Sequence, residues 1–271
     1  MIGRSSRFWL AAVFAFVVAN PAAAAKLPRS TTDRPDEVQG DQVHFLYVLP
    51  SDGADRALDT NGALATSIAV FQKWFAGQTG GLRFRIDSFQ GEPDITFYRL
   101  PKTDAEIESR GAFVRDEIEA ELNAAGFHQS GKMYAVYYDG SSTFACGGSF
   151  YPPTLPGNTV AMYLQGKPPG APPCVSNPFA SSPNASPGYW EFSMTHEILH
   201  GLGIVPACAP HHTLAGHVSD CSCDLMYAGT EPWHPSVLDF HHDDYFRAGV
   251  SGCPDLANSS FLIKDSEPKP K

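Results

Sequence analysis

This sequence has few basic residues and few long apolar stretches. Its 271 residues carry 19 lysines and arginines against 29 aspartates and glutamates, a formal charge of −10. A protein that binds nucleic acid through the phosphates needs a basic face, so we exclude nucleic acid as a partner. Only 18% of the residues are charged while 43% are hydrophobic, which excludes a disordered chain and predicts a folded one.

One apolar run stands near the start of the chain. Arg4 and Arg7 precede the run Phe8–Ala19, and the small residues Ala22–Ala25 follow it. This order is typical of a secretory signal peptide, which we place at residues 1–25. The run is too short to cross a bilayer, and no later stretch reaches the roughly 18 apolar residues that a spanning helix needs. We therefore expect a secreted or extracytoplasmic protein without membrane insertion.

Cysteine is absent from the first 145 residues, and six cysteines follow. In an exported chain this even number favours three disulfides over free thiols, and the spacing does not choose among the fifteen pairings that six cysteines allow. Cys221 and Cys223 lack the two-residue spacer of a zinc knuckle. The disulfide candidates are Cys146, Cys174, Cys208, Cys221, Cys223 and Cys253.

The rest of the chain alternates strand and helix patterns. Residues 26–40 carry charges and prolines without apolar periodicity, so we expect a mobile leader there. Helical spacing predicts helices over Asn61–Ala76 and, on the surface, Asp104–Gly126. Adjacent polar residues point around a helix, so we expect His241–Asp244 at the surface. Mixed strands and helices predict an α/β or α+β layer structure, one domain over residues 41–271. The expected strands are Val43–Leu49, Leu82–Asp87, Ile95–Leu100, Met133–Tyr138, Phe144–Tyr151 and Thr159–Leu164.

One stretch reads THEILHGLG and contains the spacing His-Glu-x-x-His. Two imidazoles four residues apart leave the same face of a helix, so His196 and His200 form a pair of zinc ligands. Positions 194, 198 and 202 on the opposite face are apolar, so the helix can bury that side. Glu197, next to the first ligand, can hold a water molecule and take its proton, which is the role of a general base.

These residues resemble the metzincin clan of zinc metallopeptidases, whose signature reads His-Glu-x-x-His-x-x-Gly-x-x-His and precedes a methionine turn below the metal. Gly203 matches the glycine of that signature, but Pro206 stands where the clan has its third histidine. Further on, Gly216–Asp220 and Asp224–Tyr227 are similar to the matrixin pattern of a third histidine, an aspartate three residues later and a Leu-Met-Tyr turn. Leishmanolysin-type members likewise insert residues before the third histidine.

The resemblance implies one catalytic zinc ion and assigns roles to the residues around it. Its third ligand is His217, with which the nearer His211 and His212 compete. Asp220 competes too, because zinc also accepts carboxylate oxygens. The side chain of Tyr227 has two possible roles, packing in the core or supplying a hydroxyl to the active site. The implied set is His196, His200 and His217 as ligands, Glu197 as general base and Met226 in the turn.

The resemblance also implies a metzincin-like fold of the α+β class. A twisted mixed sheet and a long active-site helix form an α/β-type upper subdomain over about residues 41–203, and a small irregular lower subdomain covers about 204–271. Phe144–Tyr151 is then the edge strand beside an extended peptide or protein substrate. Residues 26–40 hold no cysteine, so a thiol latch on the zinc is absent.

The activity implied is that of a secreted zinc endopeptidase. The competing class is a secreted protein in which zinc only stabilises a binding or structural fold. A purely structural site has no use for a carboxylate beside its first ligand, so Glu197 favours the enzyme.

Overall fold

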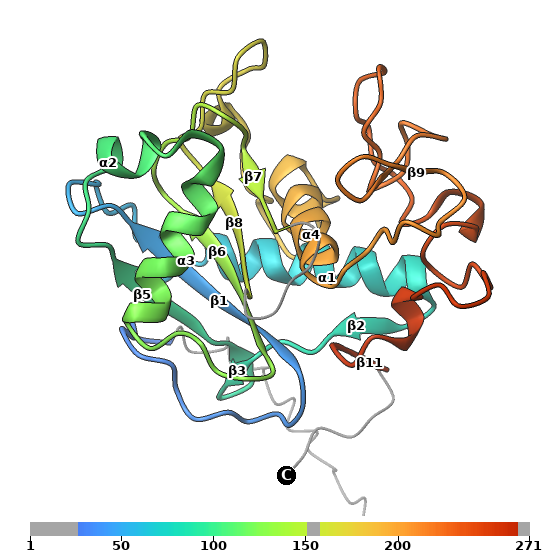
Figure 1. The fold of residues 1–271 in the computed structure, drawn as a ribbon. Helices are drawn as coiled ribbons and strands as arrows, with labels where there is room; N and C mark the ends of the chain where they lie inside the picture. Colours follow the sequence, from blue (N-terminus) through green and yellow to red (C-terminus); the bar gives the residue numbers. More distant parts are fainter. Residues whose placement is uncertain (1–26, 151–157, 265–271) are drawn as a thin grey trace, which may run out of the picture.

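A five-stranded sheet forms the centre of the protein in the computed structural model, which describes residues 27–150 and 158–264 (Figure 1). Four strands are parallel and the last is antiparallel, in the order β5-β1-β6-β8-β7. The predicted strands are confirmed at these five places, although β7 is much shorter than the stretch expected. Tyr151 of that stretch and the signal peptide predicted at 1–25 lie outside the described residues. The strands are β1 (Gln42–Leu49), β5 (Ile95–Arg99), β6 (Lys132–Tyr138), β7 (Gly147–Gly148) and β8 (Thr159–Tyr163).

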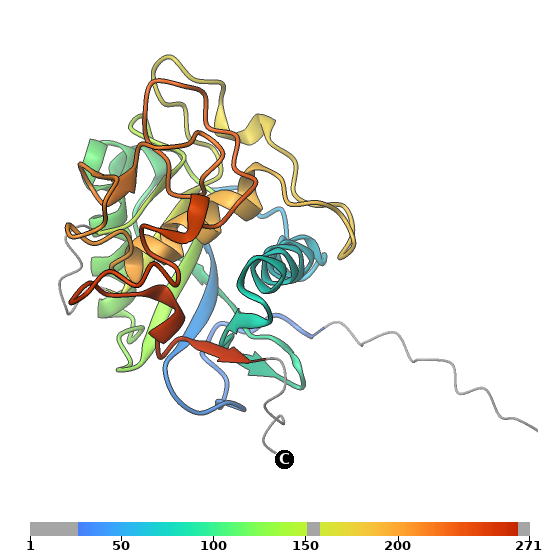
Figure 2. The same ribbon diagram turned by 90° about the vertical axis from the view of Figure 1, so that its right-hand side faces the viewer.

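Different helices cover the two faces of this sheet. Successive side chains of a strand point to opposite faces, so Phe45 of β1 packs with α1 and α4 while Leu46 packs with α2 and α3. Both faces are therefore buried, as is usual for a largely parallel sheet. Figure 2 shows α1 nearly end-on, with α4 beside it. The helices are α1 (Ala63–Thr79), α2 (Asp104–Glu108), α3 (Val114–Ala124) and α4 (Tyr189–Gly201).

The stretch Asp104–Gly126, expected as one surface helix, is two helices joined by a 3-10 turn over Gly111–Phe113. Gly111 has a φ of +58°, a backbone conformation that glycine adopts far more easily than other residues, and the chain changes direction there. None of the helices in the described part of the chain combines the length and the hydrophobicity that a bilayer-spanning segment needs.

Residues 204–264 are mostly irregular. They contain the short antiparallel strands β9 (His212–Thr213) and β10 (His217–Val218), two 3-10 turns and β11 (Leu262–Lys264). β11 pairs with β2 (Leu82–Phe84), so the strand predicted from residue 82 onward lies outside the central sheet. A further short hairpin joins β3 (Ser88–Phe89) to β4 (Glu92–Pro93).

The prediction of three disulfides is confirmed. Cys146 pairs with Cys174, Cys208 with Cys253, and Cys221 with Cys223. The second of these joins the start of the irregular segment to its end. Disulfides persist in oxidising compartments, so the three pairs indicate an extracellular or otherwise oxidising environment.

The structure differs from the expectation of a mobile leader, because residues 27–40 are bound to the sheet. Ser30 forms a parallel bridge with β5. Lys132 of β6 is 3% exposed, and its Nζ lies 2.6 Å from Asp33 Oδ2 and 2.6 Å from Asp36 Oδ1. A buried ammonium group needs carboxylate partners, and this segment supplies two of them.

Candidate metal centre

Helix α4 holds the first two candidate ligands. Met194 and Ile198 are fully buried on its core side, and His196 and His200 leave the helix on another side. The start of the helix is fixed by Glu191, whose carboxylate accepts a hydrogen bond of 2.9 Å from the backbone three residues earlier. The apolar face thus anchors the helix and leaves the two imidazoles to form a site.

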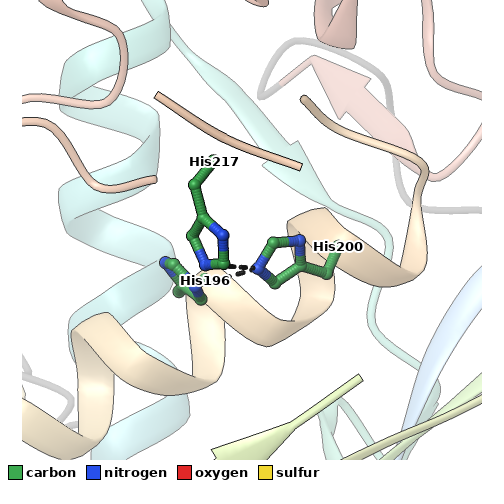
Figure 3. A group of neighbouring side chains, drawn as sticks. All are labelled: His196, His200 and His217. Atoms are coloured by element: carbon green, nitrogen blue, oxygen red, sulfur yellow. Dashed lines mark hydrogen bonds between the residues drawn. The ribbon is translucent and has the colours of Figure 1, made fainter. Parts of the chain in front are cut away.

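The structure brings His217 of β10 to the two histidines of α4 (Figure 3). Nε2 of His200 lies 3.0 Å from Nε2 of His196 and 3.2 Å from Nε2 of His217. Nδ1 of His196 lies 2.8 Å from the carbonyl oxygen of Leu225, and Nδ1 of His217 lies 3.1 Å from that of Leu214. A carbonyl oxygen only accepts, so both Nδ1 atoms carry the proton and both Nε2 atoms present lone pairs.

The Nε2 lone pairs of His196 and His217 both point toward Nε2 of His200, so a cation among the three nitrogens can accept all three when the proton of His200 is on Nδ1. Burial lowers the pKa of His217; burial and the neighbouring imidazoles lower the pKa of His196 to about 4 and that of His200 well below its usual value. The rings are therefore neutral at pH 7, the form that binds metal. Zinc–nitrogen bonds of about 2.0–2.1 Å in a tetrahedron separate ligand nitrogens by about 3.3 Å, close to the observed spacing.

The turn around Met226 supports the first ligand. Leu225 supplies the carbonyl that orients His196, and Met226 itself is fully buried. Asp224 Oδ1 accepts hydrogen bonds from Met226 N (2.7 Å) and a tyrosine hydroxyl (2.9 Å), while Oδ2 accepts one from a second backbone N–H (2.7 Å). Burial raises the pKa of Asp224 to about 7. Asp224 therefore holds the turn in the shape that presents the Leu225 carbonyl.

Glu197 lies against the edge strand of the sheet. A Cβ built on Gly147 of β7 would be 2.6 Å from Glu197 Oε1, so the carboxylate reaches this place only because residue 147 has no side chain. The carboxylate of Glu197 has no hydrogen-bond partner within residues 27–150 and 158–264. Burial raises its pKa to about 8. A carboxyl group with a raised pKa beside three metal-ligand candidates can exchange protons near neutral pH.

Comparisons with known proteins add little to this geometry. No protein-family model matches the chain, and no curated protein matches it. Among solved structures it is similar to catalytically inactive OgpA from Akkermansia muciniphila in complex with an O-glycopeptide (glycodrosocin) substrate, at 13% identity and a TM-score of 0.35 over 68% of this chain and 52% of that chain. It is also similar to a chain from a chaperone–substrate complex, at 12% identity and a TM-score of 0.30 over 66% of this chain and 28% of the other.

The other candidates for the third ligand lie outside the three-histidine group. His211 and Asp220 form a separate group with Asp243 and Asp244. His212, on β9, belongs to neither group, although it lies near enough to His217 for its charge to lower the pKa of that ring. Of the candidates for the third position, only His217 joins the histidines of α4.

Asp244 and Tyr227 both form hydrogen bonds with nearby backbone N–H groups. Asp244, expected at the surface, is 1% exposed, because its carboxylate accepts a hydrogen bond of 2.7 Å from the backbone of His211. The hydroxyl of Tyr227 accepts a hydrogen bond of 3.2 Å from Glu231 N, so it is engaged within its own turn. An active-site role for this hydroxyl stays a prediction.

The sequence analysis missed one residue of the site, Trp233, and the contacts of two others that it had placed in predicted elements. The ring of Trp233 lies 5.8 Å from that of His196, and its indole N–H lies 3.2 Å from the Leu225 carbonyl oxygen. The contacts not foreseen are the approach of Gly147, in the predicted edge strand, to Glu197 and the hydrogen bonds of Asp224, at the start of the predicted turn. Asp224 had a signal in its place directly before the Leu-Met-Tyr turn, whereas the approach of Gly147 to the site depends on strand pairing and has no local signal.

Proposed function

We propose that the protein is a secreted, zinc-dependent endopeptidase with a metzincin-like fold. The observation that carries the proposal is the convergence of three neutral imidazoles, from His196, His200 and His217, together with Glu197, which follows His196 in α4. A mixed sheet with one antiparallel edge strand next to the site supports the fold. Three disulfides support export.

The proposed chemistry divides the work between the metal and the chain. Zinc bound by the three histidines supplies an electrophile that acidifies water and polarises a peptide carbonyl. Glu197 accepts the proton of the attacking water and passes it to the leaving amine, for which a pKa raised by burial is suited. The carbonyls facing His196 and His217 fix the ring tautomers and keep Nε2 aimed at the site.

The substrate lies along β7 in this proposal. β7 ends the sheet, and its two residues, Gly147 and Gly148, have no side chains to obstruct an approaching backbone. An extended peptide can add to such an edge through main-chain hydrogen bonds. Because Glu197 lies against Gly147, a peptide on this edge passes directly by the general base.

Cleavage of a peptide library by the mature protein and its Glu197→Ala variant tests the function. Both proteins are loaded with zinc, and native mass spectrometry reports their metal content. We expect the wild type to cleave peptides and the variant to be at least about 100-fold slower with its zinc retained, because general base catalysis contributes about that much.

Glu231→Ala is the matched control, since Glu231 is an exposed glutamate. We expect its rate to equal that of the wild type. Zinc binding by the wild type without cleavage of any peptide would favour the zinc-stabilised binding or structural protein. Undiminished cleavage by Glu197→Ala would remove Glu197 from the mechanism.

A further inference from the structure

Four other side chains in the C-terminal part form a second group of potential metal ligands. Nδ1 of His211 lies 3.0 Å from Asp244 Oδ2, 3.8 Å from Asp243 Oδ1 and 3.9 Å from Asp220 Oδ2. The ligand atoms of the four residues all lie within 4.8 Å of one another. None of these residues belongs to the three-histidine site.

The charges of this group do not balance. Three carboxylates face one imidazole, and no lysine or arginine in the described residues pairs with any of them. Asp220 shows the deficit most clearly: its side chain is 10% exposed, and both carboxylate oxygens are buried without a hydrogen-bond partner among residues 27–150 and 158–264. The Asp244 side chain is fully buried, with His211 as its partner. Burying carboxylates without partners is costly, so the group lacks positive charge.

We propose that His211, Asp220, Asp243 and Asp244 bind a second divalent cation. One imidazole nitrogen with three carboxylate oxygens suits a first-row ion such as Zn²⁺ or Mn²⁺ better than Ca²⁺, which prefers oxygen ligands alone. The ion replaces the proton on His211 Nδ1, which is released to solvent. The side chains of His211 and Asp243 are 40% and 43% exposed, so an ion can enter from this side.

A cation here braces the segment that carries the third histidine of the proposed active site. His211 and Asp220 lie on either side of the β9–β10 hairpin that contains His217. Asp243 and Asp244 come from the segment that follows the Met226 turn. An ion shared by these side chains joins both ends of the hairpin to that segment, so its binding raises the melting temperature of the whole chain.

Zinc stoichiometry by native mass spectrometry tests the second site without any activity measurement. We expect two zinc ions per mature chain in the wild type. The double variant Asp220→Asn/Asp243→Asn keeps side-chain volume, and we expect it to retain only the ion of the three-histidine site. The His200→Ala variant loses that site, and we expect it to retain only the second ion. Asp243→Asn alone, at a half-exposed position, weakens the second zinc at least tenfold in a chelator competition. His241→Asn is the control, and we expect this variant to keep both ions. His241 is exposed and has a φ of +65°, a backbone conformation that asparagine tolerates.

The outcomes separate this proposal from the proposed function. A single zinc that is lost in His200→Ala and unaffected by the aspartate substitutions would overturn the second site and leave the peptidase standing. A zinc that persists in His200→Ala and disappears after the aspartate substitutions supports the second site whether or not peptides are cleaved. Binding of Ca²⁺ at this group without Zn²⁺ or Mn²⁺ would overturn the class of ion.

Discussion

Gly147 and Glu197 approach each other so closely that a change in one displaces the other. The Cβ of an alanine at 147 would lie 2.6 Å from Glu197 Oε1 and 3.1 Å from Met162 Sδ. We predict that Gly147→Ala moves the carboxylate and lowers kcat/KM on a library-selected peptide at least tenfold while zinc is retained, because small misplacements of a catalytic group are costly.

Ser149→Ala is the matched control for this prediction. Its hydroxyl is buried and has no hydrogen-bond partner in the part of the chain that the structure describes, so its removal two residues from Gly147 changes no polar contact there. We expect its kcat/KM and zinc content to match those of the wild type. Full activity of Gly147→Ala would show that the carboxylate does not act from the position described.

Residue spacing predicts some side chains of the candidate site and not the rest. His196, Glu197 and His200 could be named because four residues make about one helical turn. His217 could be ranked above its competitors only through the aspartate and the methionine turn that follow it. The carbonyl of Leu225 could not be foreseen, since every residue has a carbonyl and only the folded turn decides which one meets a histidine.

Helix α1 carries an exposed interior glycine that no tertiary contact requires. A Cβ on Gly77 would meet no atom within 4 Å. We predict that Gly77→Ala raises the free energy of unfolding by about 0.5–1 kcal/mol, because glycine loses more backbone entropy than alanine in a helix. Urea unfolding measures the difference.

Gly81→Ala is the contrasting control. A Cβ there also meets no atom within 4 Å, but φ is +100°, a conformation that alanine rarely adopts. We expect this variant to be less stable than the wild type. A destabilised Gly77→Ala would contradict the description of this end of α1.

Whole elements were predictable where their periodicity reflects burial. The strands of the central sheet and the apolar face of α4 follow this rule, because both bury a regular subset of side chains. The break at Gly111 depends on the backbone conformation of a single residue. The pairing of β2 with β11 depends on a segment far along the chain. The binding of residues 27–40 likewise depends on Lys132, which no local pattern connects to them.

Stability of the whole molecule depends on pH through its buried carboxylates. Asp239 is 2% exposed, its Oδ2 accepts two backbone hydrogen bonds, and its Oδ1 has no hydrogen-bond partner among the described residues. Burial raises its pKa to about 6 from an ordinary value of 3.8. The folded chain therefore keeps a proton that the unfolded chain loses between about pH 4 and pH 6. The contribution of this group to the free energy of unfolding falls as pH rises through that window and is constant above it.

We predict that Asp239→Asn, which keeps the accepting oxygen and carries no charge, abolishes this fall. Its free energy of unfolding relative to the wild type rises between pH 4 and pH 6 by up to about 3 kcal/mol and then stays level. Urea unfolding at pH 4, 5, 6 and 7 in the presence of a chelator measures this. A difference between the two proteins that does not vary with pH would contradict the prediction.

The candidate metal centre joins the two parts of the molecule, since α4 comes from the layered part and β10 from the irregular part. The most direct test of this claim is a zinc-edge anomalous difference map from crystals of the mature protein grown with one equivalent of zinc. We predict the strongest peak between the Nε2 atoms of His196, His200 and His217. No peak there, or the strongest peak at another group of side chains, would contradict it.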